Sequence, residues 1–181
     1  MGRIGDNGRG KLIDAAFNCF AQFGYEKASS RLIAAEAGVA LGLIHRHFEG
    51  KRGLLEATDI KYLEWARQRA QRGLPTLWGS GGDQQLSESD QLAIAYLQKA
   101  VMQPRPGSKE LTQKWLEIAT QDIIDAQKSG VIELHATPEQ CARILLMLET
   151  GALILSDVGL DDPHTQKNDM LKAMSHIITP C

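Results

Sequence analysis

Two short helical segments separated by a glycine constrain the fold of this chain more than any other feature. The sequence predicts one helix over about residues 31–37 and another over about residues 41–48. Gly38 lies in the turn between them and Gly50 follows the second. Glycine ends helices readily because it adopts left-handed backbone conformations without a steric penalty. Helices this short are unstable alone, so both must pack against a further helix.

That further helix precedes them. Leu12, Ala16 and Phe20 recur at helical spacing, and Gly24 then ends the pattern. Ser29 or Ser30 is suited to cap the next helix, because a serine oxygen accepts a hydrogen bond from a free backbone N–H. An apolar helix followed by two short helices and a tight turn is typical of a helix-turn-helix, here at about residues 30–48. In such a motif the second short helix enters the DNA major groove.

Helical periodicity continues beyond this head, and no strand is predicted. The expected later helices cover about residues 51–72, 86–103, 108–129, 138–158 and 163–178. Residues 1–10 are expected to form a mobile arm, since they are rich in glycine and polar side chains and lack an apolar period. The prediction is an all-α protein of about eight or nine helices. Residues 1–52 form the arm and the three-helix head, and residues 53–181 form a helical body.

Charge is divided unevenly between these two parts. The net charge is −2, yet the segment up to Gly53 holds eight basic and five acidic residues. A basic head on an acidic body fits a protein that meets phosphate with one face. The bias is modest, so a chance distribution is the alternative.

Several classes of protein are disfavoured. Cys19, Cys141 and Cys181 are too far apart for a disulfide framework or a metal motif, and they suit a reducing cytoplasm. His45 and His47 point away from each other on a helix, so no metal is expected there. No cofactor is expected either. No nucleophile–base spacing suggests an enzyme, and no apolar run is long enough to cross a membrane.

The segment from Ser29 to Leu54 resembles the helix-turn-helix of the tetracycline-repressor (TetR) family of bacterial transcriptional regulators. The matching positions are Ile33, Ala34, Ala37, Gly38, Val39, Gly42, His47, Phe48, Lys51 and Leu54. The stretch from Ala15 to Tyr25 is also similar to that family's first helix and turn. The resemblance is strong over about residues 9–55, and beyond them it depends on helix count and layout.

The resemblance implies roles for individual residues at a DNA surface. Ser29 would cap its helix and touch a phosphate, Lys51 would hold another phosphate, and His45 and His47 would face DNA. Arg46 is the longest polar side chain of the recognition helix, and arginine can pair bidentately with guanine. Arg3 and Arg9 would follow the backbone or enter a minor groove. The full predicted DNA-binding set is Ser29, Ser30, Arg31, Ala40, Leu41, Gly42, Leu43, His45, Arg46, His47 and Lys51.

Some positions depart from the family pattern. Ala40 replaces a capping Ser or Thr, Gly50 replaces a capping Ser, and Leu41 and Leu43 replace polar residues. Leucines cannot hydrogen-bond a base edge, but they can contact a thymine methyl group. Alternatively Leu43 belongs to the core, or DNA binding is weak.

The resemblance also implies that the body binds a small effector and forms a homodimer. The dimer would use the helices at about residues 138–158 and 163–178, and it would bind a pseudo-palindromic operator in the cytoplasm, on the nucleoid. Aromatic and Met residues suggest a hydrophobic effector, although each is as readily explained as core. The candidates are Tyr62, Trp65, Trp78, Tyr96, Met102, Trp115, Ile118 and Met147. The alternatives are a helical ligand- or protein-binding module that has lost DNA recognition, and a small helical enzyme.

Overall fold

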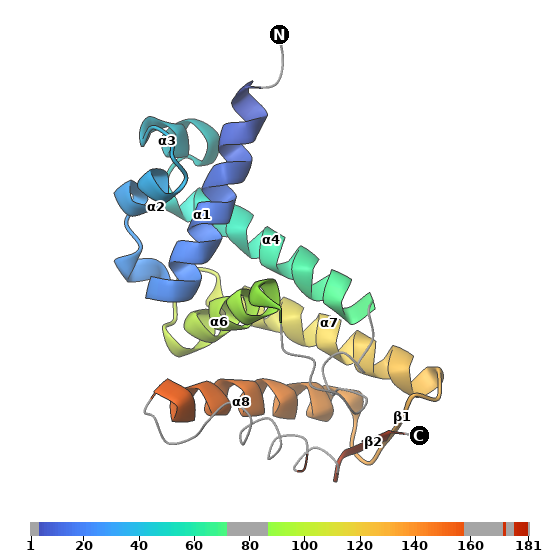
Figure 1. Ribbon diagram of the computed structural model, residues 1–181. Coiled ribbons are helices and arrows are strands. Elements are labelled where there is room, and N and C mark those ends of the chain that lie inside the picture. The colour runs from blue at the N-terminus through green and yellow to red at the C-terminus, as the bar shows by residue number, and fades with distance from the viewer. Residues whose placement is uncertain (1–3, 72–86, 158–171, 173–175, 181) are drawn as a thin grey trace. The chain divides into compact units, whose positions relative to one another are not determined.

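The computed structural model describes residues 4–71, 87–157, 172 and 176–180, and within them the protein is almost entirely helical (Figure 1). The expected all-α fold class is therefore confirmed. The elements are α1 (Ile4–Lys27), α2 (Ser30–Glu36), α3 (Gly42–Phe48), α4 (Lys51–Gln71), α6 (Glu88–Met102), α7 (Ser108–Lys128), β1 (Ile132–Leu134), α8 (Pro138–Asp157) and β2 (Ile178–Pro180).

The prediction of a mobile arm over residues 1–10 is wrong from residue 4 onward, because α1 begins at Ile4. Tertiary contacts account for the difference. The guanidinium of Arg9 lies 5.3 Å from the centre of the Phe48 ring, and Gly8 lies beside the Leu43 side chain. Packing of this kind outweighs the poor helix propensity of glycine. Arg3 lies outside the described residues.

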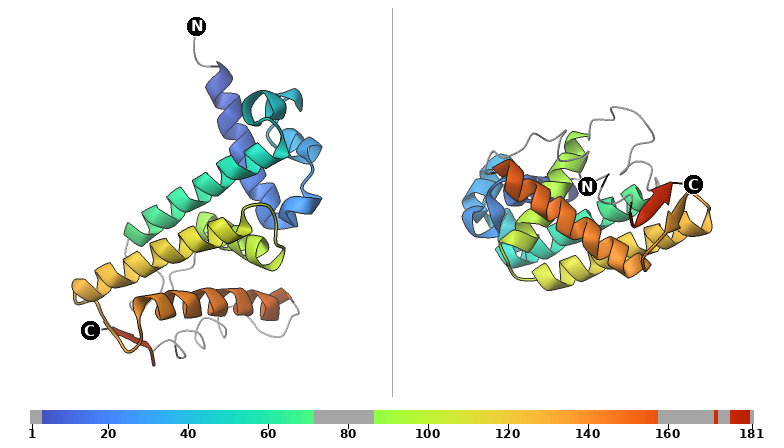
Figure 2. Two further views of the ribbon diagram at one scale, coloured as in Figure 1. Left: turned by 180° about the vertical axis from the view of Figure 1, so that it is seen from behind. Right: turned by 90° about the horizontal axis from the view of Figure 1, so that it is seen from below.

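The expectation that the chain has no strand is also wrong. β1 and β2 pair antiparallel, with Ile132 opposite Pro180 and Leu134 opposite Ile178, near the end of α7 (Figure 2). The prediction of a helix over 163–178 is therefore wrong at its last residue, because Ile178 begins β2. Most of that helix falls outside the described residues. The pairing joins positions more than forty residues apart, so local periodicity gives no signal for it.

The chain divides into two compact units. The first consists of Met1–Trp65 and Leu86–Thr112, and the second of Ala66–Gln85 and Gln113–Cys181. This division follows packing, so the functional boundary expected at residue 52 stays a prediction. Helices α4 and α7 each contribute to both units. No helix within the described segments has both the length and the apolar character needed to cross a membrane.

In the first unit, α1 packs against α2, α3 and α6. Leu12, Phe20, Ile33, Ile44 and Leu54 are among its buried side chains. The helical spacing of Leu12, Ala16 and Phe20 therefore indicated the buried face of α1 correctly.

An aromatic stack with a buried ion pair completes the first unit. Phe17 of α1 stacks on Tyr96 of α6 with ring centres 4.7 Å apart, and Tyr96 stacks on Tyr62 of α4 at 5.5 Å. Both terminal nitrogens of the Arg105 guanidinium group donate hydrogen bonds to the carboxylate of Asp59, at 2.6 and 3.1 Å. The Tyr96 hydroxyl donates to the same carboxylate at 2.6 Å. The Arg105 side chain is 4% exposed, so this pair is largely removed from water.

The second unit has its own core, formed where α7, β1, α8 and β2 meet. Its buried members are Ile123, Ala126, Ile132, Cys141, Ala142, Leu145 and Ile178. A reciprocal capping box begins α8, as the sequence predicts through a Thr at position 137 followed three residues later by a Gln. The Gln140 N–H donates to the Thr137 hydroxyl at 3.3 Å, and the Thr137 N–H donates to the Gln140 side-chain oxygen at 3.0 Å.

Replacing Arg105 by Ala should strongly destabilise the first unit. Removing one partner of a buried pair leaves the other charge desolvated, and this typically costs about 3–5 kcal/mol. Urea or guanidinium denaturation measures the loss. The matched control is Lys61→Ala, which breaks the ion pair with Asp14 on the surface, where the side chains are 41% and 68% exposed. Exposed pairs contribute about 0–1 kcal/mol, so equal losses for the two variants would contradict this account.

Asp122 of α7 should make stability depend on pH. Burial and the neighbouring Asp125 carboxylate raise the pKa of Asp122 to about 6, while Arg69 opposes this shift. The folded state therefore holds the Asp122 proton more tightly than the unfolded chain does. The stability that this proton contributes is full below about pH 4 and disappears as the pH rises through about 6.

Asp122→Asn should thus unfold at a higher temperature than the wild type above pH 6, with the difference vanishing near pH 4. Thermal melts across this range measure the effect. Glu117→Gln, which changes an exposed carboxylate on the same helix, is the control for the loss of one negative charge from α7. A constant difference at every pH would show that the substitution acts through packing and not through the proton.

Candidate DNA-binding interface

Helix α2 is fixed at both ends by local hydrogen bonds. The Ser29 side-chain oxygen accepts from the Leu32 N–H at 3.1 Å, so Ser29 is the N-cap and Ser30 is the first helical residue. At the other end Gly38 has a positive φ of 63°, and the Val39 N–H donates to the Ala34 carbonyl at 3.0 Å. This six-to-one bond is the mark of a Schellman C-cap, which here forms the turn of the motif.

Helix α3 has a buried side and an exposed side. Ile44 is 0% and Phe48 is 6% exposed, so these two residues hold the helix against the unit. On the other side His45 and Arg46 are exposed, as is Leu41 just before the helix. Leu43 and His47 are intermediate. Leu43 is therefore only partly core, with its methyl group close to Gly8 of α1.

The start of α3 lacks a side-chain cap. Leu41 occupies the N-cap position and makes no capping hydrogen bond through its side chain. Neither Leu41 nor Ala40, where the family pattern has a capping Ser or Thr, carries a hydroxyl that could accept such a bond. The first turn is instead closed by backbone bonds, from the Leu43 N–H to Ala40 and from the Ile44 N–H to Leu41.

The connection from α3 to α4 is tight. Glu49 adopts a left-handed conformation with φ 59°, and α4 begins two residues later at Lys51. A Cβ atom at Gly53 would overlap the Phe48 carbonyl oxygen, so no larger residue fits at position 53. The first turn of α4 is thereby held directly against the end of α3.

Lys51 lies against an aromatic face. Its ammonium nitrogen is 4.1 Å from the centre of the Tyr25 ring, which is a cation–π distance. Partial burial lowers the pKa of Lys51, while the Glu26 carboxylate opposes that shift.

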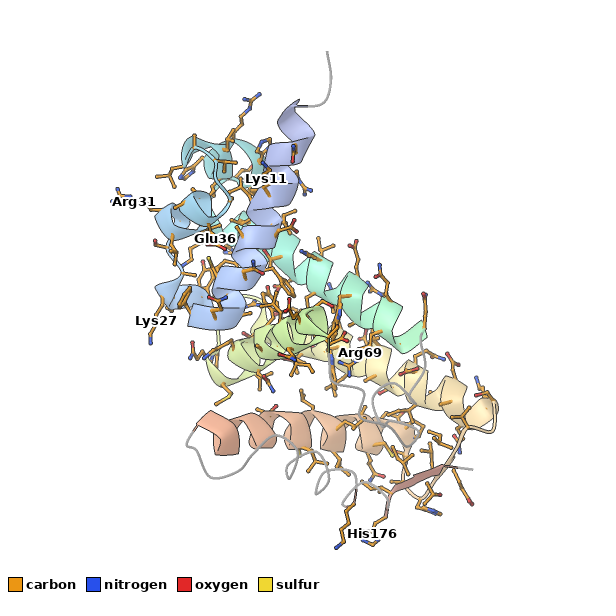
Figure 3. The ribbon with its side chains drawn as sticks, in the orientation of Figure 1. Lys11, Lys27, Arg31, Glu36, Arg69 and His176 are labelled. Atoms are coloured by element: carbon orange, nitrogen blue, oxygen red, sulfur yellow. The ribbon has the colours of Figure 1, made fainter. Side chains whose placement is uncertain are left out.

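The structure places the predicted DNA-binding residues at the start of α2, along α3 and at the start of α4, all within the first unit. Arg31 extends from α2 away from α1, and Lys27 points outward from the end of α1 (Figure 3). Arg46 and Arg52 are also exposed. This unit therefore carries exposed basic side chains on and beside the helix-turn-helix.

Two features of this region were missed by sequence reasoning. Tyr25 was assigned no role, although its place directly after Gly24 put it at a turn. Arg9 was expected on a mobile arm, but it lies over the Phe48 ring. Both contacts join residues far apart in the sequence, so no local pattern indicates them.

The predicted effector-binding residues are distributed over both units. Tyr62, Trp65, Tyr96 and Met102 belong to the first, whereas Trp115, Ile118 and Met147 belong to the second. Trp78 lies outside the described residues. Tyr96 is sandwiched among Phe17, Tyr62 and the Arg105 guanidinium, so its ring has a structural role already. Met102 and Met147 are 42% and 70% exposed.

The second unit contains an open hollow of about 440 Å³ between α7 and α8. Its lining residues are Leu116, Glu117, Thr120, Gln121, Glu139 and Arg143, and none of these was among the candidates. The two glutamates and the arginine make this hollow more polar than the apolar pocket expected for a hydrophobic effector.

Comparison with known proteins agrees with the geometry of the first unit. The sequence model of a family described as "Bacterial regulatory proteins, tetR family" matches residues 12–58. The chain is 28% identical over 151 residues to the HTH-type transcriptional regulatory protein RaaS of Mycobacterium tuberculosis, covering 80% of this chain and 69% of that protein. It is 44% identical over 64 residues to the regulator BetI of Pseudomonas aeruginosa, covering 35% of this chain and 32% of BetI.

Solved structures extend the likeness to the whole fold. A crystal structure of a TetR-family regulator from Rhodococcus superposes with a TM-score of 0.69 at 21% sequence identity, covering 96% of this chain and all of the other. The named relatives are transcriptional regulators and not enzymes. The match to the tetR family model falls within α1 to α4, where the buried and exposed sides of a helix-turn-helix have just been described, so residues 12–58 carry the helix-turn-helix of the TetR family of bacterial transcriptional regulators.

Proposed function

We propose that this protein is a DNA-binding transcriptional repressor whose operator binding is controlled by a small effector held in the helical body. The observation that carries the proposal is the two-sided character of α3. Ile44 and Phe48 are buried, while His45 and Arg46 project from the opposite side. Such a helix presents hydrogen-bonding side chains on a rigid support, as major-groove recognition requires.

Phosphate contacts flank this helix in the proposed complex. Ser29, Ser30 and Arg31 lie at the start of α2, and Lys51 lies at the start of α4. Contacts on both sides of α3 would fix its depth and register in the groove without reading sequence.

We further propose a homodimer formed through α8 and the segment that follows it. Met147 of α8 is 70% exposed, the largest value among the exposed large hydrophobic side chains described, and this supports a partner on that helix. Two-fold symmetry would present two copies of α3 to a pseudo-palindromic operator. The protein would act in the cytoplasm, where it is bound to the nucleoid when it holds its operator.

Arg46→Ala should weaken binding to the specific operator by about 1–3 kcal/mol, or about 5- to 150-fold, because it removes a bidentate contact with guanine. Fluorescence anisotropy can measure this on a duplex that the wild type selects from random DNA. Lys114→Ala removes the same charge from an exposed position on α7 and is the control. Equal losses for the two variants would indicate charge alone, and no loss for either would favour the rival, a helical binding module without DNA recognition.

Leu41 should read a thymine methyl group, because it is 42% exposed beside α3 and cannot hydrogen-bond a base. Replacing single thymines of the selected duplex by uracil deletes one methyl group at a time. At one position we expect the wild type to lose affinity by about the value of one buried methyl, or roughly 0.8 kcal/mol. The variant Leu41→Ser should be insensitive to that change. Equal sensitivity of both proteins would remove Leu41 from base readout.

A further inference from the structure

We propose that Tyr25 is a positioning residue for DNA binding, holding the Lys51 ammonium on its ring face so that Lys51 meets a backbone phosphate in a fixed place. The proposal rests on the proposed function, since it assigns Lys51 to a phosphate. Its basis is the 4.1 Å separation between the Lys51 nitrogen and the Tyr25 ring centre.

The position of Tyr25 follows from the kink that precedes it. Gly24 interrupts α1 with φ 77° and ψ 166°, and a Cβ there would collide with the Gln103 side chain at the end of α6. The Tyr25 ring also packs on the Phe20 ring at 5.7 Å, and Phe20 is buried. The kink at Gly24 and the contact with Phe20 thus define where the Tyr25 ring lies beside Lys51.

Lys51 is constrained from the other side. It is the first residue of α4, and α4 is held against the Phe48 carbonyl at Gly53. A lysine at a helix N-terminus meets the positive end of the helix dipole, which disfavours its charge. The negative face of an aromatic ring offsets that repulsion.

Contact with the ring leaves Lys51 able to bind an anion. An ammonium has three N–H donors, and a ring face engages one side of it. The Lys51 residue remains partly exposed, so a phosphate can approach the free side. The ring contact restricts the Lys51 side chain before the phosphate binds. Phosphate binding therefore costs less side-chain rotamer entropy than it would for a lysine without that contact.

A double-mutant cycle tests this role in the full-length protein. The variants are Tyr25→Leu, Tyr25→Phe, Lys51→Ala and the double variant Tyr25→Leu/Lys51→Ala, each checked for folding by thermal melting. The probe is the duplex that the wild type selects from random DNA, titrated over a salt series. Lys51→Ala should lower the slope of log affinity against log salt by about 1.

Tyr25→Leu should weaken DNA binding by about two- to five-fold, the size of an exposed cation–π contact. Tyr25→Phe keeps the ring and should bind like the wild type. In the Lys51→Ala background Tyr25→Leu should have no further effect, because the group that it positions is gone. Equal losses from Tyr25→Leu in both backgrounds would mean a general structural role and would overturn the proposal, as would no loss at all.

A second measurement separates this proposal from the proposed function. In the free protein the Tyr25 ring should shift the Lys51 ε-methylene proton resonances upfield, and Tyr25→Leu should abolish that shift. If the wild type binds no duplex while the shift is present, the proposed function fails and the phosphate role of Lys51 fails with it. If the wild type binds DNA but the shift is missing, Tyr25 does not hold Lys51, and this proposal alone is overturned.

Discussion

The geometry of the first unit depends on the close approach of α4 to the end of α3. At Gly53 the backbone of α4 lies against the Phe48 carbonyl so closely that even a methyl group has no room. The side chains at a contact set how closely two helices approach. Because residue 53 has no side chain, the backbone of α4 meets the end of α3 directly, and this contact fixes the direction in which the chain leaves α3. Both Lys51 and the exposed side of α3 take their positions from it. A glycine at residue 53 is therefore required by packing and not by backbone conformation.

Helix α3 gains its stability from burial and not from its own sequence. It has seven residues and no side-chain cap, and Gly42 opens it. A peptide with these properties would not be helical in water. The buried Ile44 and Phe48, with Arg9 over the Phe48 ring, supply the contacts that hold it. The side chains of His45 and Arg46 are exposed and lie outside this buried contact, so they are available for recognition of a partner.

What the sequence predicted well depends on interactions within a few residues. The capping box at Thr137 and Gln140, the Ser29 cap and the glycine turn at Gly38 all form over three to five positions, so their residue types suffice to indicate them. The errors concern contacts between distant segments. The α1 residues before position 11 are helical because Gly8 and Arg9 meet Leu43 and Phe48, and these contacts leave no periodic trace.

The same distinction explains why Tyr62 and Tyr96 were candidates for an effector pocket. Aromatic side chains on helices fit a pocket and a core equally well when only their spacing is known. In the structure Tyr96 packs beside a residue that spacing could not connect to it, because Arg105 lies 46 positions after its partner Asp59. Arg105 lies over the Tyr96 ring at 5.3 Å and pairs with the carboxylate to which Tyr96 also donates. The Arg105 guanidinium therefore already occupies the space over one face of the Tyr96 ring. A hydrophobic effector could reach this face of the ring only if it displaced Arg105, and the Asp59 carboxylate would then lose its partner.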